Sequence, residues 1–463
     1  MQKTKAMLLF LAIFVLLFVS ACSNNSNSKN GNGEQPADKP AAENANKETP
    51  VQEEPPAEPE QPALDMKGES IKIMLWYGEP VAGTEEGDLV IARQKEIEKK
   101  YNTKIEWVKV PWGEPIQMIT AAALSGAPVA DIVALDRYHA IPAVNQGLLQ
   151  PIDDYFDFNE GKWPKGIKDF GSWNGKMYGF TERVTGSAGM YYNKTLFERE
   201  GLPDPHDLIA EDKWNWDTFL DIAKKATKDT NGDGVIDQWG LANEAGTLAR
   251  IMIYANNGTM MEQKDGKWMF PAENANMIEA LRFMGDMFNT HKVIAPNDGN
   301  DDYNESQTLF SSGKAAMVTG ELWEGAERKT MTDEQGFVYF PKGPKASEYV
   351  NNVANFIMWY MPANAKKPKE VATIWQDFIL WDRIDKLKRE DAEKQNLASE
   401  KDIELMMNIT DFVQPVFLPL GGLFGEITGS IAMKGESPET VLQRSKQMAQ
   451  DGLDTNLNTA PAK

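Results

Sequence analysis

The sequence predicts an α/β fold in which mostly parallel sheets carry helices on both faces. The first observation is the alternation of strand and helix patterns between Ser70 and Leu135, which is typical of parallel sheets. The second is length, because the stretch from Lys67 to Lys463 is long enough to build two lobes. The third is that no segment of this stretch is apolar enough to span a bilayer.

The N-terminus has the pattern of a signal peptide over residues 1–21. Two lysines precede an apolar run at residues 7–19, and small residues lead to Cys22. The sequence Val19-Ser20-Ala21-Cys22 is typical of a lipobox, in which the cysteine is lipidated and becomes the mature N-terminus. Stable anchoring then needs more than one acyl chain, such as an added palmitate. The alternative is an ordinary secretory signal with an incidental cysteine, although Cys22 is the only cysteine in the chain.

Residues 22–66 predict a lipidated cysteine followed by a disordered spacer. This stretch is rich in Ser, Asn, Gly, Pro, Glu and Ala, so it cannot bury enough apolar surface to offset its chain entropy. We expect it to hold the folded part away from the membrane. The whole chain has a formal net charge of −21 and a pI of about 4.7. Because affinity for phosphate backbones comes from basic patches, nucleic acid is not expected as a partner.

The first elements after the spacer alternate in type. We expect strands at 70–77, 104–110 and 130–135, and helices at 90–101 and 116–125. Because ligands of such sheets bind beyond the carboxyl ends of the strands, residues that follow these strands are the first candidates for a site.

The stretch from Asn174 to Leu241 carries strong local signals. Asn174-Gly175 predicts a hairpin turn, because glycine takes positive φ without steric cost. Residues 189–192 are an apolar, aromatic run typical of a buried strand, and the helix that follows begins at Asn193 and ends at Gly201. The remaining predicted elements are helices at 217–227, 277–288, 370–380 and 440–449, a short strand and loop at 239–244, a buried strand after Gly313 and a strand at 337–340.

Two motifs identify a family. Tyr191 to Pro203 reads Y-Y-N-K-x-L-F-x-x-x-G-L-P, and Phe310 to Met317 reads F-x-x-G-K-A-A-M. Both resemble the bacterial extracellular solute-binding proteins of ABC importers, the group that contains maltose- and oligosaccharide-binding proteins. The resemblance implies two α/β lobes that close by hinge motion, with about three crossings of the chain near 181–187, 341–349 and 411–415.

The resemblance also implies the lobe boundaries and the function. We expect an N-terminal lobe at 67–183 plus 345–412 and a C-terminal lobe at 184–344 plus 413–463. We expect a monomeric lipid-anchored receptor that binds a carbohydrate, most simply an oligosaccharide, and delivers it to ABC permease subunits. The alternative is a surface glycan-binding or glycan-cleaving protein without a transporter.

The ligand candidates are aromatic, acidic and basic residues at the loops that follow strands. Aromatic rings stack on the apolar faces of sugars, and charged groups bond the hydroxyl edges. The candidates are Trp76, Trp112, Asp136, Arg137, Glu182, Glu244, Trp323 and Phe424. The resemblance maps sugar contacts to Asp136, Arg137, Glu244 and Trp323. For Asp136 and Arg137 a local ion pair at a helix start is an equal alternative, and any single tryptophan can be a packing residue, as we expect for Trp214, Trp216 and Trp375.

A candidate calcium loop runs from Asp229 to Asp237. Its alternate oxygen-bearing residues, Asp229, Asn231, Asp233 and Asp237, and the backbone carbonyl of Val235 fit the first part of an EF-hand loop. The twelfth position is Gly240 rather than a bidentate glutamate, so the loop departs from the full pattern. A metal-free turn rich in Asp, Asn and Gly is the alternative.

Enzyme chemistry has little support in the sequence, and we expect a protein that is not an enzyme. The three histidines have no metal-ligand spacing, and no G-x-S-x-G stretch occurs. A glycosidase pair such as Glu182 and Glu244 is left open, since carboxylates are plentiful.

Overall fold

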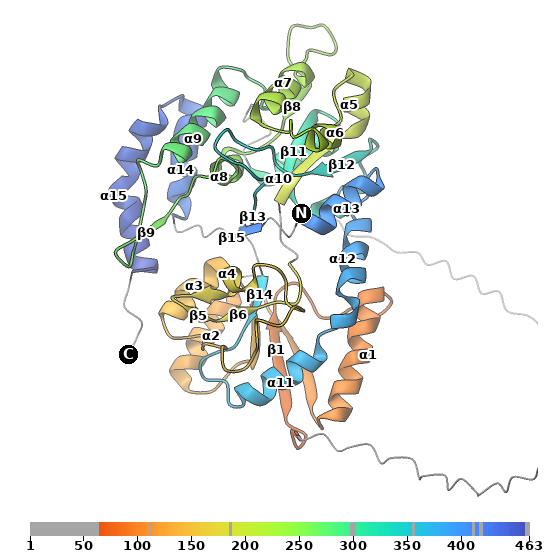
Figure 1. Cartoon of the computed structure of the whole chain (residues 1–463), viewed down its shortest axis with the longest axis vertical. Helices are drawn as coiled ribbons and strands as arrows, with labels where there is room; N and C mark the ends of the chain where they lie inside the picture. The colour runs from red at the N-terminus through yellow and green to blue at the C-terminus, as the bar shows by residue number, and fades with distance from the viewer. Residues whose placement is uncertain are drawn as a thin grey trace, which may run out of the picture. The chain divides into compact units, whose positions relative to one another are not determined.

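Figure 1 shows the computed structural model. Its first sheet has the strand order β2-β1-β3-β14-β6. The structure describes residues 64–111, 113–184, 188–296, 302–353, 357–409, 413–415 and 420–458, with the backbone alone at 351–353 and 413–415. The strands are β1 (Ser70–Leu75), β2 (Lys104–Lys109), β3 (Ile132–Asp136), β6 (Gly179–Phe180) and β14 (Ile357–Tyr360). β1 runs parallel to β2 and β3, whereas β14 runs antiparallel to β3 and β6.

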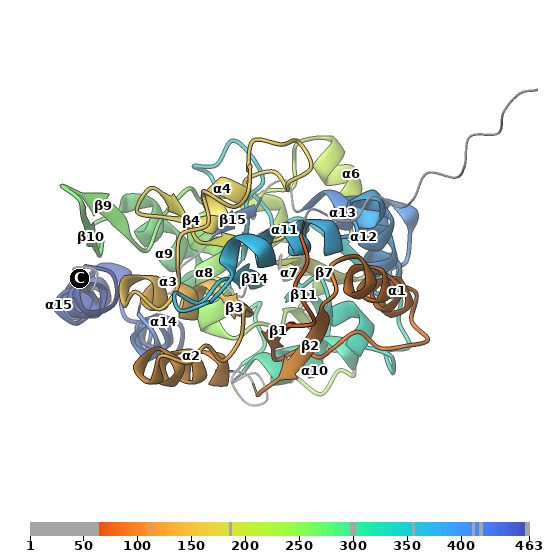
Figure 2. The same ribbon diagram turned by 90° about the horizontal axis from the view of Figure 1, so that it is seen from below.

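Helices surround the first sheet, as the view from below shows (Figure 2). They are α1 (Glu85–Lys100), α2 (Glu114–Ser125), α3 (Arg137–Asn145), α4 (Ile167–Gly171) and α11 (Pro368–Phe378). α1 begins earlier than the apolar pattern predicts, because the side chain of Thr84 caps it by accepting the amide N–H of Gly87. The acidic first turn of α1 adds favourable interactions with the helix dipole.

The second sheet has the order β12-β7-β11-β8. Its strands are β7 (Ala188–Asn193), β8 (Trp239–Leu241), β11 (Ala315–Glu321) and β12 (Gln335–Val338). β7 runs antiparallel to β11 and β12, and β11 runs parallel to β8. The predicted α/β class is therefore confirmed, and the expectation of mostly parallel sheets is corrected: both sheets are mixed. The strand–helix alternation behind that expectation covers β1 to β3, whereas β14 enters the first sheet after the chain has passed through the second.

Most of the remaining helices begin or end at recognisable sequence signals. They are α5 (Lys194–Glu200), α6 (Pro205–Ala210), α7 (Trp216–Ala226), α8 (Ala245–Ala255), α9 (Ala275–Asn289), α10 (Tyr303–Ser311), α13 (Glu400–Asn408), α14 (Gly422–Lys434) and α15 (Pro438–Asn456). Asn193 caps α5 by accepting the amide of Leu196, and Gly201 ends it at φ +64°, as predicted. α7 begins in a capping box formed by Asn215 and Thr218.

Short hairpins and bridging segments complete the fold. The predicted turn at Asn174 and Gly175 joins β4 (Ser172–Trp173) to β5 (Lys176–Met177), and both turn residues have positive φ. A second hairpin joins β9 (Glu262–Lys264) to β10 (Lys267–Met269). Trp173 and Trp268, one from each hairpin, stack with ring centroids 5.2 Å apart.

The chain passes between the two sheets where β6 gives way to β7 and where β12 is followed by β14. Near the second passage, β13 (Asn351–Val353) pairs in parallel with β15 (Val413–Pro415). The turn η2 (Trp381–Arg383) and helix α12 (Ile384–Glu393) follow α11 and lead to α13. α13 contacts β12, where the amide of Phe337 donates to the buried carboxylate of Asp402 at 2.8 Å. Residues 395–408 thus contact the second sheet, within the range 345–412 that we expected in the first lobe.

No helix among the described ranges combines the length and the apolar character that a membrane crossing needs.

Candidate functional site

The larger of two neighbouring pockets has a volume of about 640 Å³ and lies beyond the carboxyl end of β1. Tyr77 follows β1 and is 52% exposed, and its ring centroid is 6.4 Å from that of Trp359 on β14. Trp76 is half-buried and packs edge-on against Tyr77 at 5.6 Å. Trp76 does not itself line the pocket, whereas Tyr77 and Trp359 do. The pocket thus has aromatic rings in its wall and lies at a strand end, where the fold class predicts a site.

Glu182 supplies the acidic group of this pocket. It lies just after β6, and its Oε2 atom is buried with no hydrogen-bond partner among the described residues. Burial raises the pKa of Glu182, and the neighbouring carboxylate of Glu86 acts in the same direction. A hydrogen bond from its own backbone amide, the charge of Arg183 and a weaker hydrogen bond from the indole of Trp359 to the carboxylate oppose the rise. Because a buried polar atom without a partner is costly, this oxygen is suited to accept a hydrogen bond from a bound molecule.

Arg183 borders the same pocket and connects two helices. Its guanidinium forms ion pairs with Glu86 on α1 and, at 2.9 Å, with Asp391 on α12. Burial lowers the pKa of Arg183, but the carboxylates of Asp391, Glu86 and Glu182 outweigh it and raise the pKa. Sequence analysis missed Arg183, although it follows Glu182 directly at the predicted crossing of the chain.

A second pocket of about 200 Å³ also has Arg183 in its wall. Trp323, at the end of β11, lines this pocket and is 46% exposed. Its indole Nε1 donates to Oε2 of Glu321 at 2.8 Å, which fixes the ring. Met406 and Met407 of α13 form another part of the wall. The prediction that Trp323 presents a ring to a ligand is consistent with this position.

Arg250 is a further charged residue that sequence analysis missed, and it interacts electrostatically with Glu321 and Glu244. It is only 9% exposed and lies within the otherwise apolar helix α8. Burial lowers the pKa of Arg250, while the negative charges of Glu321 and Glu244 raise it. Glu244 itself caps α8, since its carboxylate accepts the amides of Gly246 at 2.5 Å and Thr247 at 2.6 Å. The sequence signal that could have identified Arg250 was a single charged residue within a largely apolar helical segment.

The predicted residues Asp136 and Arg137 have local partners. Asp136 caps α3 by accepting the amide of His139 at 2.9 Å, and it contacts the imidazole Nδ1 of the same residue at 2.8 Å. The carboxylate thus pairs with His139 rather than with Arg137. Arg137 donates to the carbonyl of Asp169 at 3.1 Å, and burial lowers its pKa.

Two other candidates are Phe424 and Trp112. Phe424 is 9% exposed on α14 and packs into the core, and Trp112 lies outside the described residues. The tryptophans expected to pack do so, since Trp214, Trp216 and Trp375 are 0%, 5% and 4% exposed.

The loop from Asp229 to Asp237 is held by its own side chains. The two carboxylate oxygens of Asp229 accept the amides of Gly232 and Gly234 at 2.7 Å, and Asp237 accepts the amide of Thr230 at 2.8 Å. These bonds, with that from Gly234 foremost, lower the pKa of Asp229. In the described part of the chain, no three His, Cys, Asp or Glu side chains gather closely enough to hold a metal. The donor types suit calcium.

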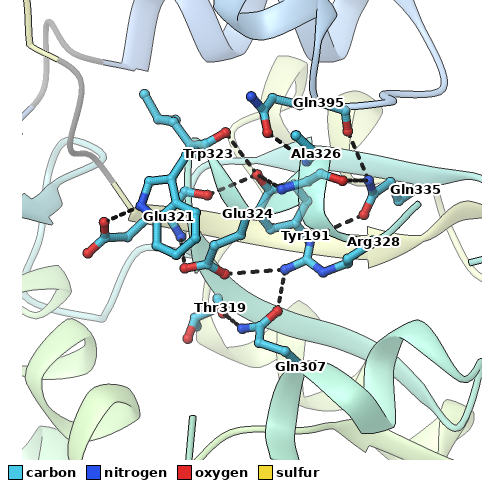
Figure 3. A network of polar contacts seen from close by, with 12 residues as sticks. Tyr191, Gln307, Thr319, Glu321, Trp323, Glu324, Ala326, Arg328, Gln335 and Gln395 are labelled. Atoms are coloured by element: carbon cyan, nitrogen blue, oxygen red, sulfur yellow. Dashed lines mark hydrogen bonds and ion pairs between the residues drawn. The ribbon is translucent and has the colours of Figure 1, made fainter. Parts of the chain in front are cut away.

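Beneath Trp323 lies a buried polar network (Figure 3). It joins the turn η1 (Glu324–Glu327) to Tyr191 on β7, to Gln335 on β12 and to Gln395 after α12. The loop that carries Trp323 is therefore fixed from several elements at once.

Comparison with known proteins identifies the family of this chain. The family model described as bacterial extracellular solute-binding protein matches residues 83–381, which is more than half of the chain. This chain is a member of that family. The expected family resemblance is thereby confirmed, and the family is one of binding proteins by its description.

Individual relatives are more distant. Maltodextrin-binding protein MdxE of Bacillus subtilis is 26% identical over 305 residues, which cover 61% of this chain and 66% of MdxE. A putative binding protein of Brucella abortus is 26% identical over 275 residues, and the match spans 58% of this chain and 62% of that relative's length. The maltose/maltodextrin-binding domain MalE from Bdellovibrio bacteriovorus, solved with maltotriose, has a TM-score of 0.57 at 17% identity, over 82% of this chain and 99% of that chain. This last likeness shows the fold.

Proposed function

We propose that this solute-binding protein is the carbohydrate receptor of an ABC importer. In this proposal it captures an oligosaccharide between two hinged lobes and delivers it unchanged to a membrane permease. Family membership supports the solute-binding role, and the names of relatives that bind maltodextrin or maltotriose support a sugar as the solute.

The observation that carries the proposal is the buried Oε2 atom of Glu182, which has no partner among the described residues and lies in a pocket walled by Tyr77 and Trp359. A sugar fits such a pocket, because its hydroxyls donate to a carboxylate and its ring faces stack on aromatic rings. A pocket of about 640 Å³ is within the range of small-molecule sites. The second pocket, with Trp323, extends the available wall and favours a ligand of more than one sugar unit.

The test is isothermal titration calorimetry with a panel of maltose- and mannose-type oligosaccharides. We expect at least one ligand to bind, and Glu182→Gln to weaken its binding by about tenfold, since a lost hydrogen bond to a charged group costs roughly 1.5 kcal/mol. Trp323→Ala should weaken the same ligand. Glu426→Gln, which alters an exposed carboxylate on α14, is the matched control and should leave the affinity unchanged. A panel without any binder, or reducing ends released from a bound glycan, would refute the proposal.

We also propose that Cys22 is lipidated and anchors the protein on the extracytoplasmic side of the cell membrane. The lipobox sequence supports this location. Cell fractionation of the wild-type protein and of Cys22→Ser tests it. The wild type should sediment with membranes and the variant should be released, and equal partition would refute the anchor.

Calcium binding at Asp229, Asn231, Asp233, Val235 and Asp237 stays a proposal, supported by the donor types and their spacing. Thermal unfolding with calcium and with EDTA tests it. A bound ion should raise the melting temperature of the wild type and not that of Asp233→Ala. Identical melting curves would identify the loop as a metal-free turn.

A further inference from the structure

We propose that Glu324 is a positioning residue whose ionised carboxylate holds Trp323 in place, so that the ligand site at Trp323 responds to pH. The consequence for ligand affinity rests on the proposed function, whereas the response of Trp323 itself does not. The inference stands on the network in Figure 3.

Glu324 bonds directly to the backbone of the loop that carries Trp323. It is 2% exposed, and its Oε1 atom accepts the amide N–H of Glu321 at 2.7 Å. Its Oε2 atom forms an ion pair with Nη2 of Arg328 at 3.3 Å. One carboxylate therefore fixes the loop on the strand side of Trp323 and binds the arginine that follows the turn.

Arg328 is itself held rigidly, so it acts as a fixed support. Its guanidinium lies 4.1 Å from the ring centroid of Tyr191 and 5.1 Å from that of Phe310. Nη1 donates to Oε1 of Gln335 at 3.1 Å, and Nη2 bonds to Gln307. Because these groups leave Arg328 little room to move, the ion pair with Glu324 transmits their rigidity to the loop.

The backbone of the loop is also fixed by neutral hydrogen bonds. The hydroxyl of Tyr191 donates to the carbonyl of Glu321 at 2.9 Å, and the amide of Gly325 donates to the same hydroxyl at 3.2 Å. On the far side, the amide of Ala326 donates to Oε1 of Gln395 at 2.9 Å. Glu324 is thus the group in this network whose charge can change while it bonds both the loop and its support.

The titratable groups that face Glu324 come from several elements. They are Arg328 after the turn, Glu321 on β11, Tyr303 on α10 and Tyr191 on β7. Burial raises the pKa of Glu324 to about 7, and hydrogen bonds from Tyr303 and the amide of Glu321, together with the attraction of Arg328, do not overcome it. Ionisation costs folding free energy because the carboxylate is buried, yet the ionised form makes the stronger bonds to the amide and to the guanidinium.

This pKa sets the size of the expected effect. With a pKa of about 7, roughly nine tenths of the molecules carry an ionised Glu324 at pH 8 and about one tenth at pH 6. If the ionised form is the one that binds, the apparent dissociation constant rises by up to about tenfold between pH 8 and pH 6.

The direct test is 19F NMR of the full chain labelled with 5-fluorotryptophan. The resonance of Trp323 is assigned by its loss in Trp323→Phe. We expect this resonance to shift with a midpoint near pH 7 in the wild type and in Glu327→Gln, an exposed control on the same turn. In Glu324→Gln, which keeps the shape and an acceptor oxygen, the shift should disappear.

Glu321 needs a separate control experiment, because its carboxylate accepts a hydrogen bond from the indole of Trp323 and burial raises its pKa. A titration that survives in Glu324→Gln and is lost in Glu321→Gln would assign the effect to Glu321 and overturn the inference, as would a Trp323 resonance that does not titrate. If Glu324→Gln does not fold, the inference is tested by the midpoint of the wild-type Trp323 titration and by whether that titration persists in Glu321→Gln. If no saccharide binds at any pH, the proposed function fails, and the NMR titration still decides the role of Glu324.

Discussion

Removing the guanidinium of Arg183 should destabilise the protein through the loss of a link between α1 and α12. The side chain of Arg183 is 13% exposed, and those of Glu86 and Asp391 are 33% and 40% exposed. Breaking a fully buried ion pair costs roughly 3–5 kcal/mol and losing an exposed one costs about 0–1 kcal/mol. Since this triad lies between those limits, we expect Arg183→Met to lower the free energy of unfolding by about 2 kcal/mol.

Urea denaturation of a double-mutant cycle measures this link. The cycle combines Arg183→Met with Asp391→Asn, and then with Glu86→Gln, and the coupling energies isolate the pairwise interactions. Lys386→Met is the control, because its ion pair with Glu85 joins the same two helices through exposed side chains. A loss below about 0.5 kcal/mol, or coupling energies no larger than those of the control, would show that Arg183 does not tie the helices together.

Three further outcomes are expected. Gly320→Ala should cost about 1–3 kcal/mol in urea denaturation, because the added methyl group would collide with the Glu324 carboxylate and the Tyr191 ring; an unchanged midpoint would contradict this packing. Asn215→Ala should cost about 1 kcal/mol by removing the cap of α7, and Asn215→Ser should recover most of it. Because the pKa of Glu324 is raised from 4.5 to about 7, its contribution to stability is fully present below about pH 4.5 and is lost as the pH rises through 7. The wild type should therefore lose on the order of 3 kcal/mol relative to Glu324→Gln between pH 4.5 and pH 8, and parallel pH profiles of the two proteins would argue against a raised pKa.

The elements predicted from sequence were those with local signals. α5 was predicted with its cap and its end, because Asn193 and Gly201 mark both boundaries within the helix's own sequence. The polar helix α12 was missed, since it has few apolar residues and is stabilised by ion pairs such as that between Arg389 and Glu393. The antiparallel strand β14 was also missed, because its place in the first sheet depends on chain passages that no local pattern encodes.

The candidate site was likewise predicted only where local sequence signals mark its residues. Glu182 and Trp323 were found because they lie where a strand or a predicted passage of the chain ends, and both line pockets. Arg183 and Arg250 were missed because partners such as Asp391 and Glu321 are distant in sequence, and Glu324 was missed because no local pattern shows that its carboxylate is buried. Phe424 was included for its aromatic ring, but that ring is buried in the core at α14.

The guanidinium of Arg183 forms part of the wall of both pockets. A ligand that displaces this shared group in one pocket therefore alters the wall of the other pocket as well. If Arg183 moves in this way, the binding free energy of a molecule that fills both pockets differs from the sum for its two halves. Two fragments that each fit one pocket then change each other's affinity when they are supplied together.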